Sequence, residues 1–175
     1  MRLPLTSCVV RSWEPGDVPS LVRHANNRRI WLNLRDRFPH PYTAADGTSF
    51  IRRVRAGYPE TTFAIEVDGE AAGGIGFMLQ QDIERVSAEV GYWLGEQYWG
   101  RGVCTEALRA ITRYAIEHHE LTRVFAVPLA HNRASCRVLE KAGFVVEGHL
   151  RRSAIKDGKH VDQVLYAFIV EDGRS

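Results

Sequence analysis

The sequence predicts an α+β fold in a single domain over residues 1–175, because helical and strand periodicities occur in mixed order. The clearest helix covers Val103–His119, where apolar residues recur every three or four positions. The clearest hairpin is centred on Asp68-Gly69, which two segments of alternating hydrophobicity flank. The expected strands cover residues 5–11, 62–67, 71–80, 86–94, 123–129, 144–152 and 160–170, and the expected helices cover residues 18–25, 44–56, 103–119 and 134–142.

Composition and charge exclude several classes of protein. The chain is 45% hydrophobic and 25% charged, with no apolar run near the roughly 20 residues that span a bilayer. Its first ten residues, interrupted by Pro4, predict a strand entry instead of a secretory signal, so we expect a cytoplasmic protein. A net charge of +2 gives no support for nucleic-acid binding, and the three cysteines lack metal-ligand spacing, so no metal is expected.

An aromatic segment precedes the second expected helix. Residues 30–42 include Trp31 and Phe38 and show neither helical nor strand periodicity. This density of aromatic side chains predicts a wall of a substrate pocket that contains Trp31 and Phe38. A packed structural loop explains the same segment equally well.

The loop between the strand 86–94 and the helix Val103–His119 has the features of an anion site. Gly100 and Gly102 allow the backbone to turn tightly and to approach a ligand closely. The amides at the helix start have no intrahelical acceptor, and the helix dipole favours a negative charge there. The pattern predicts a pyrophosphate site, although two glycines alone would also suit a plain strand-to-helix connection.

Other phosphate-binding loops fit the chain less well. It contains no Gly-x-x-x-x-Gly-Lys-Ser/Thr sequence. The glycine-rich run at residues 73–76 lacks the Gly-x-Gly-x-x-Gly spacing of dinucleotide-binding loops. The loop before Val103 therefore remains the best candidate.

Three motifs occur in order in the central part of the chain. The first, Gln97-x-x-Gly100-x-Gly102, resembles the Gln/Arg-x-x-Gly-x-Gly/Ala signature of the GNAT superfamily of N-acetyltransferases. The preceding segment Glu-Val-Gly-Tyr-Trp-Leu at residues 89–94 and the later segment Asn-Arg-Ala-Ser-Cys-Arg-Val-Leu-Glu-Lys-Ala-Gly-Phe at residues 132–144 are similar to the branch of ribosomal-protein N-terminal alanine and serine acetyltransferases. The three motifs span about residues 89–148.

The resemblance implies a fold and a bound co-substrate. The fold would have a mostly antiparallel central sheet of six to seven strands, with one splayed strand pair and about four flanking helices. Acetyl-CoA would lie along the strand 86–94, with its pantetheine arm beside Trp93 and Leu94 and its pyrophosphate on the loop. Asn132 would contact the pantetheine side, although a helix-capping role suits the same residue. The cofactor-binding residues of the loop would be Gln97, Gly100, Arg101, Gly102, Val103, Cys104 and Thr105.

Acetyl transfer needs a neutral amine, a polarised thioester and a stabilised thiolate. Glu89 is the candidate base, directly or through water, and a solvated strand glutamate is the alternative reading. Many family members carry a general-acid tyrosine seven residues after the asparagine, where this chain has Leu139. The branch has a serine three residues after the asparagine, which Ser135 matches, so we expect Ser135 to hydrogen-bond the departing thiolate. A serine that bonds local backbone is the alternative.

The acceptor remains open between a peptide α-amine and a small amine such as a polyamine or an aminoglycoside. An α-amine has a pKa of about 7.7–8.0 and a lysine amine about 10.4, so the α-amine needs less help from a base. A catalytically idle acyl-CoA-binding module and an arginine-rich nucleic-acid binder are the remaining alternatives. We expect acetyl-CoA and an amine as partners, without nucleic acid or membrane, and a monomer or homodimer.

Overall fold

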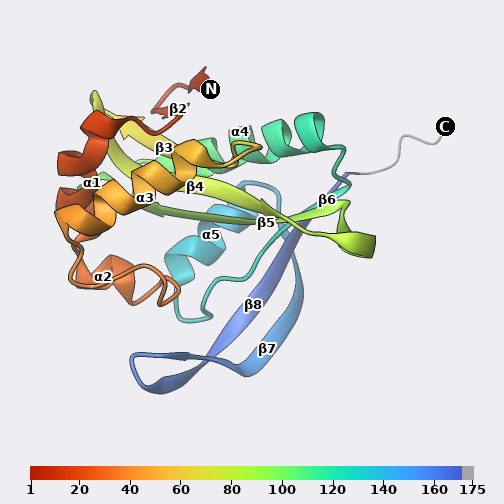
Figure 1. Ribbon diagram of the computed structural model, residues 1–175. Helices are drawn as coiled ribbons and strands as arrows, with labels where there is room; N and C mark the ends of the chain where they lie inside the picture. Colours follow the sequence, from red (N-terminus) through yellow and green to blue (C-terminus); the bar gives the residue numbers. More distant parts are fainter. Residues whose placement is uncertain (171–175) are drawn as a thin grey trace. The chain divides into compact units, whose positions relative to one another are not determined.

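The computed structural model describes residues 1–170 (Figure 1). Its contacts divide the chain into two compact units. The first unit comprises residues 1–76 and 92–107, and the second comprises residues 77–91 and the chain from Leu108 onward. Strands β4 (Glu70–Leu79) and β5 (Ser87–Leu94) and helix α4 (Val103–His119) have residues in both units. The expectation of a single domain stays a prediction.

The predicted α+β class is confirmed by the order and pairing of the strands. The strand order is β1-β2-β3-β4-β5-β6-β8-β7, in which β5 and β6 pair in parallel and the other assigned pairs are antiparallel. The described chain has eight strands instead of the expected six to seven. Besides β4 and β5, the strands are β1 (Arg2–Pro4), β2 (Val9–Arg11), β3 (Thr62–Val67), β6 (Arg123–Ala126), β7 (Val145–Lys156) and β8 (Lys159–Ile169).

The expectation of a single strand over residues 5–11 is wrong. Residues 5–8 form a turn between β1 and β2, in which the Leu5 amide donates to the Cys8 carbonyl oxygen at 2.8 Å. The Glu106 carboxylate accepts the amides of Thr6 at 2.7 Å and Ser7 at 2.8 Å. Because these donors lie a hundred residues from their acceptor, the chain pattern around the turn could not indicate it.

Two helices cover the apolar face of the first unit. Helix α1 (Val18–Ala25) and helix α3 (Ala44–Ala56) have the predicted bounds and lie side by side in Figure 1. Thr43 and Asp46 form a capping box at the start of α3, which satisfies amides that the helix leaves unpaired. A short helix, α2 (Arg28–Trp31), begins the aromatic segment that was expected to be a loop. The buried core of this unit comprises Trp13, Leu21, Ala25, Tyr42, Ile51, Ala64 and Ala71.

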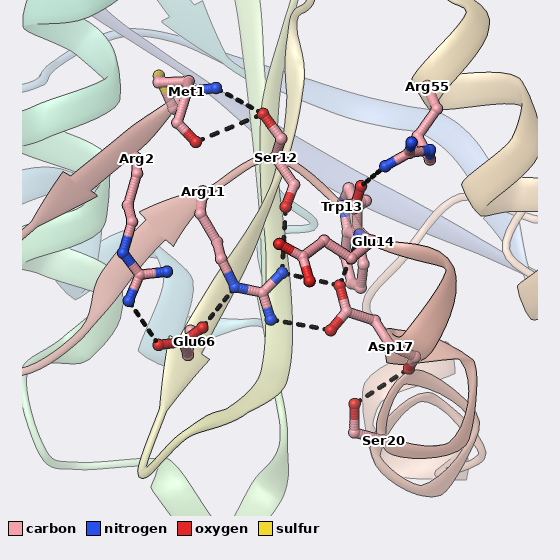
Figure 2. A network of polar contacts seen from close by, with 10 residues as sticks. All are labelled: Met1, Arg2, Arg11, Ser12, Trp13, Glu14, Asp17, Ser20, Arg55 and Glu66. Atoms are coloured by element: carbon pink, nitrogen blue, oxygen red, sulfur yellow. Dashed lines mark hydrogen bonds and ion pairs between the residues drawn. The ribbon is translucent and has the colours of Figure 1, made fainter.

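A buried ion-pair network ties β2 to the start of α1 and to β3 (Figure 2). Arg11 binds Asp17 through two parallel hydrogen bonds of 2.8 Å and also donates from Nε to Glu66. The hydrogen bond to Asp17 is the largest cause of the raised pKa of Arg11, and burial acts against it. Since charges inside a protein are tolerated only when paired, this network fixes where α1 begins.

The second unit contains the rest of α4 together with β6, helix α5 (Arg133–Lys141), β7 and β8. Helix α4 has the predicted bounds, and α5 begins and ends one residue before its predicted bounds. The parallel register pairs Ser87–Glu89 of β5 with residues 123–125 of β6 and does not continue to Val90 and Ala126. Strand β5 therefore runs beyond its last β6 partner, as the splayed pair implied by the resemblance requires.

Candidate active site

The predicted phosphate loop has an open, tightly turned backbone. Gly100 has φ +77° and Gly102 has φ +80°, a region that residues with a Cβ atom rarely adopt. A Cβ atom placed on either glycine would meet nothing within 4 Å. The glycines therefore serve the turn while leaving free space above the backbone.

The amides of this loop are donors without acceptors. Within residues 1–170, no acceptor is found for the N–H groups of residues 100–105. The first bond of α4 runs from the Glu106 amide to the Gly102 carbonyl oxygen at 3.2 Å. Unpaired donors at the positive end of a 17-residue helix suit a diphosphate. The described residues therefore fit the pyrophosphate of a CoA thioester.

A polar network centred on Glu70 joins the loop to α1 and β4. The Tyr98 hydroxyl donates to Glu70 Oε1 at 2.8 Å, and His24 Nε2 lies 3.0 Å from the same oxygen. Arg23 also binds Glu70. Burial, followed by the charge of Arg23, lowers the pKa of His24, so a neutral ring is favoured at this position. A Cβ atom on Gly95 would come within 2.7 Å of His24 Nδ1, which shows how closely the loop packs on α1.

The side chains of the loop take different environments. Gln97 is exposed, and the Arg101 guanidinium lies 5.3 Å from the Tyr98 ring and 3.5 Å from Asp68. Burial raises the pKa of Cys104 to about 12, so its thiol stays protonated. Thr105 is half-buried, and Val103 is buried. The loop therefore offers amides and one arginine, and no thiolate.

One contact between the aromatic segment and β5 is made by Phe38. Phe38 packs edge-on against Trp93 of β5, with 5.5 Å between the ring centroids. Trp93 packs against the core of the first unit, and Leu94 is buried. Trp31 instead pairs with His40 at 5.8 Å. Phe38 is thus in contact with a predicted cofactor residue, and the pocket role of Trp31 and Phe38 stays a prediction.

The second unit holds the predicted residues on the thiolate side. Asn132 caps α5, because its Oδ1 accepts the Ser135 amide at 3.2 Å. The capping reading of Asn132 is therefore confirmed, and it leaves the side-chain amide nitrogen for other uses. Ser135 is half-buried in the first turn of α5. Glu89 is half-buried in β5, at the last position that pairs with β6.

The segment before Asn132 is held by β8. The Asn132 amide donates to the Leu129 carbonyl oxygen at 2.9 Å, and the Ala130 amide donates to the Asp162 carbonyl oxygen at 2.8 Å. The Val164 amide donates to the Pro128 carbonyl oxygen at 3.1 Å. Strand β8 therefore sets where α5 begins.

Comparison with known proteins identifies the family. The family model described as acetyltransferase (GNAT) domain matches residues 8–145. The chain belongs to the GNAT acetyltransferase family. Its GNAT signature lies at Gln97, Gly100 and Gly102, on the loop whose amides are open.

Individual relatives resemble this GNAT chain over part of their length. The protein YdaF of Bacillus subtilis (strain 168) is 35% identical over 58% of this chain and 55% of its own length. Ribosomal-protein-serine acetyltransferase of Escherichia coli (strain K12) is 31% identical over 62% of this chain and 60% of its own length. The matches thus span between about half and three-fifths of these curated relatives. The solved structure of Mycobacterium smegmatis RimJ in complex with CoA-disulfide is 25% identical, with a TM-score of 0.85 over 97% of this chain and 87% of that chain.

Neither a metal-ligand cluster nor a membrane-spanning helix occurs in the described part of the GNAT chain. Residues 1–170 contain no group of three or more His, Cys, Asp or Glu side chains arranged to hold a metal ion. Over the same residues, no helix is both long and apolar enough to cross a membrane.

Sequence reasoning missed the network around Glu70. Its members come from α1, the start of β4 and the turn before α4, and nothing in their local sequence pattern relates them. The signal that the sequence offered was His24, a histidine at the end of an amphipathic helix.

Proposed function

We propose that this chain transfers acetyl from acetyl-CoA to a primary amine by direct attack of the amine, and that the acceptor is a peptide α-amine. The observation that carries the proposal is the run of open amides at residues 100–105, above two glycines with free space. Membership of the GNAT family supports acetyl-CoA as the donor. One relative is named for acetylation of a ribosomal-protein serine, which supports a protein acceptor.

Bound acetyl-CoA supplies the electrophilic thioester carbonyl carbon. The amides of residues 100–105 and the dipole of α4 hold the diphosphate and so fix the position of the thioester. Gln97 and Arg101 flank that anchor. Trp93 and Leu94 lie in β5, whose backbone beyond Glu89 has left the β6 ladder and offers hydrogen-bonding groups to the pantetheine amides.

The catalytic residues of this proposal lie in the second unit. Glu89 accepts the proton of the attacking amine, directly or through a water molecule. Ser135 donates a hydrogen bond to the sulfur that leaves, and Asn132, which caps the same helix turn, binds the pantetheine side. Leu139 stands where many family members have a tyrosine acid, so this chain needs another donor at the thiolate.

Proton affinity favours an α-amine over a lysine amine as the acceptor. With a pKa of about 7.7–8.0, on the order of a tenth of an α-amine is neutral at pH 7, whereas a lysine amine at about 10.4 is neutral only in a few molecules per ten thousand. The more acidic amine needs less help from a general base, which suits Glu89 acting directly or through water.

The test is release of CoA thiol from acetyl-CoA, measured across peptides with free N-termini, their N-terminally blocked forms, polyamines and aminoglycosides. The proposal predicts turnover with free peptides and none with blocked peptides that retain lysine. Turnover confined to polyamines or aminoglycosides would reassign the acceptor. Tight CoA binding without turnover on any amine would identify an acyl-CoA-binding module.

A further inference from the structure

Strand β7 carries a β-bulge in its second half, before the turn into β8. The antiparallel register pairs Leu150 with Gln163 and Ala154 with Val161, so residues 151–153 stand opposite Asp162 alone. We call residues 151–153 the β7 bulge. Arg152 has φ +51°, a conformation that costs a non-glycine residue free energy and that tends to persist where function needs it.

Hydrogen bonds of the Asp162 and Ser153 side chains, in which the one Ser153 hydroxyl proton is shared between two acceptors, fix the shape of the β7 bulge. Asp162 Oδ1 accepts the Arg152 amide at 2.7 Å. The Ser153 hydroxyl lies 2.9 Å from the Leu150 carbonyl oxygen and 3.0 Å from Gln163 Oε1. These contacts join the bulge to β8 and to Leu150 of its own strand.

The β7 bulge presents exposed basic side chains. Arg151 and Arg152 are adjacent and exposed, and neither guanidinium has a partner within residues 1–170. Lys159 and His160 are exposed on the first residues of β8. The Asp162 carboxylate lies at the bulge itself, where it accepts the Arg152 amide and forms no ion pair with either guanidinium within residues 1–170. An acidic ligand could therefore bind here without breaking an existing ion pair.

The β7 bulge is connected to the proposed thiolate side through two residues of β8. Gln163, which contacts Ser153, also donates from Nε2 to the Val127 carbonyl oxygen at 3.3 Å. Asp162, which holds the Arg152 amide, also accepts the Ala130 amide through its carbonyl oxygen. The same two residues thus support the bulge and the segment 127–130 that leads into Asn132.

We propose that the β7 bulge binds the acceptor: Arg151 and Arg152 recognise carboxylate side chains that follow the N-terminal amine of an acidic polypeptide. This inference rests on the proposed function and names the substrate class of that site. Guanidinium groups bind carboxylates through paired hydrogen bonds, and a positive surface steers acidic chains while repelling polyamines and aminoglycosides. Nucleic acid is less well matched, because it needs an extended basic face and the net charge of the chain is only +2.

The experiment compares peptides of equal length that share their first residues and continue with glutamates, glutamines or lysines. The R151E/R152E double variant is compared with R113E, which reverses an exposed arginine on α4 that has no partner in the described part of the chain. For the glutamate peptide, R151E/R152E is expected to lower kcat/KM about tenfold through KM, and R113E to change it less than about twofold. For the glutamine peptide, both variants should keep wild-type kcat. Rising salt should weaken the glutamate preference of the wild type.

Several outcomes would overturn the inference and leave the proposed function standing. Equal kcat/KM for the three peptides in the wild type would show that the bulge does not select acidic acceptors. An equal loss on all three peptides in R151E/R152E, with CoA affinity unchanged, would indicate a structural role. Binding of duplex RNA that R151E/R152E abolishes, without any peptide preference, would assign the bulge to nucleic acid. Absence of turnover on every peptide would instead refute the proposed function.

Discussion

Replacement of Gly102 by alanine should lower both the stability of the folded protein and its affinity for CoA, and the two losses can be measured separately. Gly102 has φ +80°, and a Cβ atom there meets nothing within 4 Å. Without ligand, the substitution should therefore lower the free energy of unfolding only through the left-handed backbone conformation, which costs an L-residue about 1–2 kcal/mol. In the complex, the methyl group would occupy the space above the amides that the diphosphate needs.

The loss of affinity follows from the hydrogen bonds displaced. A hydrogen bond to a charged group contributes about 1.5–3 kcal/mol, so losing one raises the Kd for CoA about 10- to 150-fold. Isothermal titration calorimetry with CoA measures this change, and urea unfolding measures the stability of the same variant. We expect Gly102→Ala to show both effects.

Gly158 supplies the matched control. It has φ +72° in the turn between β7 and β8, and a Cβ atom there also meets nothing within 4 Å. Gly158→Ala should lose a similar free energy of unfolding and bind CoA like the wild type. If Gly102→Ala and Gly158→Ala lose equal stability and bind CoA equally well, the diphosphate does not lie on the loop.

Four further predictions address the catalytic residues and the stability of the fold. Ser135→Ala should slow single-turnover acetyl transfer about 10- to 100-fold and keep acetyl-CoA affinity, and an unchanged rate would remove the serine from the mechanism. Glu89→Gln should slow transfer and alter its pH–rate profile, and an unaltered profile would exclude it as the base. Because the folded state lowers the pKa of His24, the unfolded chain binds the proton first. The free energy of unfolding should therefore decrease as pH falls below about 6.5, with a smaller slope in His24→Gln by urea titration. Arg11→Met leaves the buried Asp17 carboxylate without its ion-pair partner, so it should lower the free energy of unfolding by about 3–5 kcal/mol in the same assay. The double variant Arg11→Met/Asp17→Leu should recover part of that loss.

Local sequence patterns were sufficient wherever a short segment decides its own conformation. Asp68-Gly69 predicted the β3–β4 turn because both residues adopt positive φ, at +52° and +83°. The apolar period of Val103–His119 predicted α4 with its observed bounds. The open loop before α4 follows from the same local rules, since a helix start always leaves its first amides unpaired.

Tertiary structure alone decided the features that join residues far apart in the chain. Glu106 captures the turn at Thr6, and Glu70 collects donors from α1 and from the turn before α4. The β7 bulge was not predicted, because the register of an antiparallel pair depends on which partner strand it meets. The sequence by itself determined the periodic elements and the family signature, since these need only neighbouring residues. The supports of the phosphate loop and the basic bulge required the folded chain, because their energy comes from contacts between segments that only folding brings together.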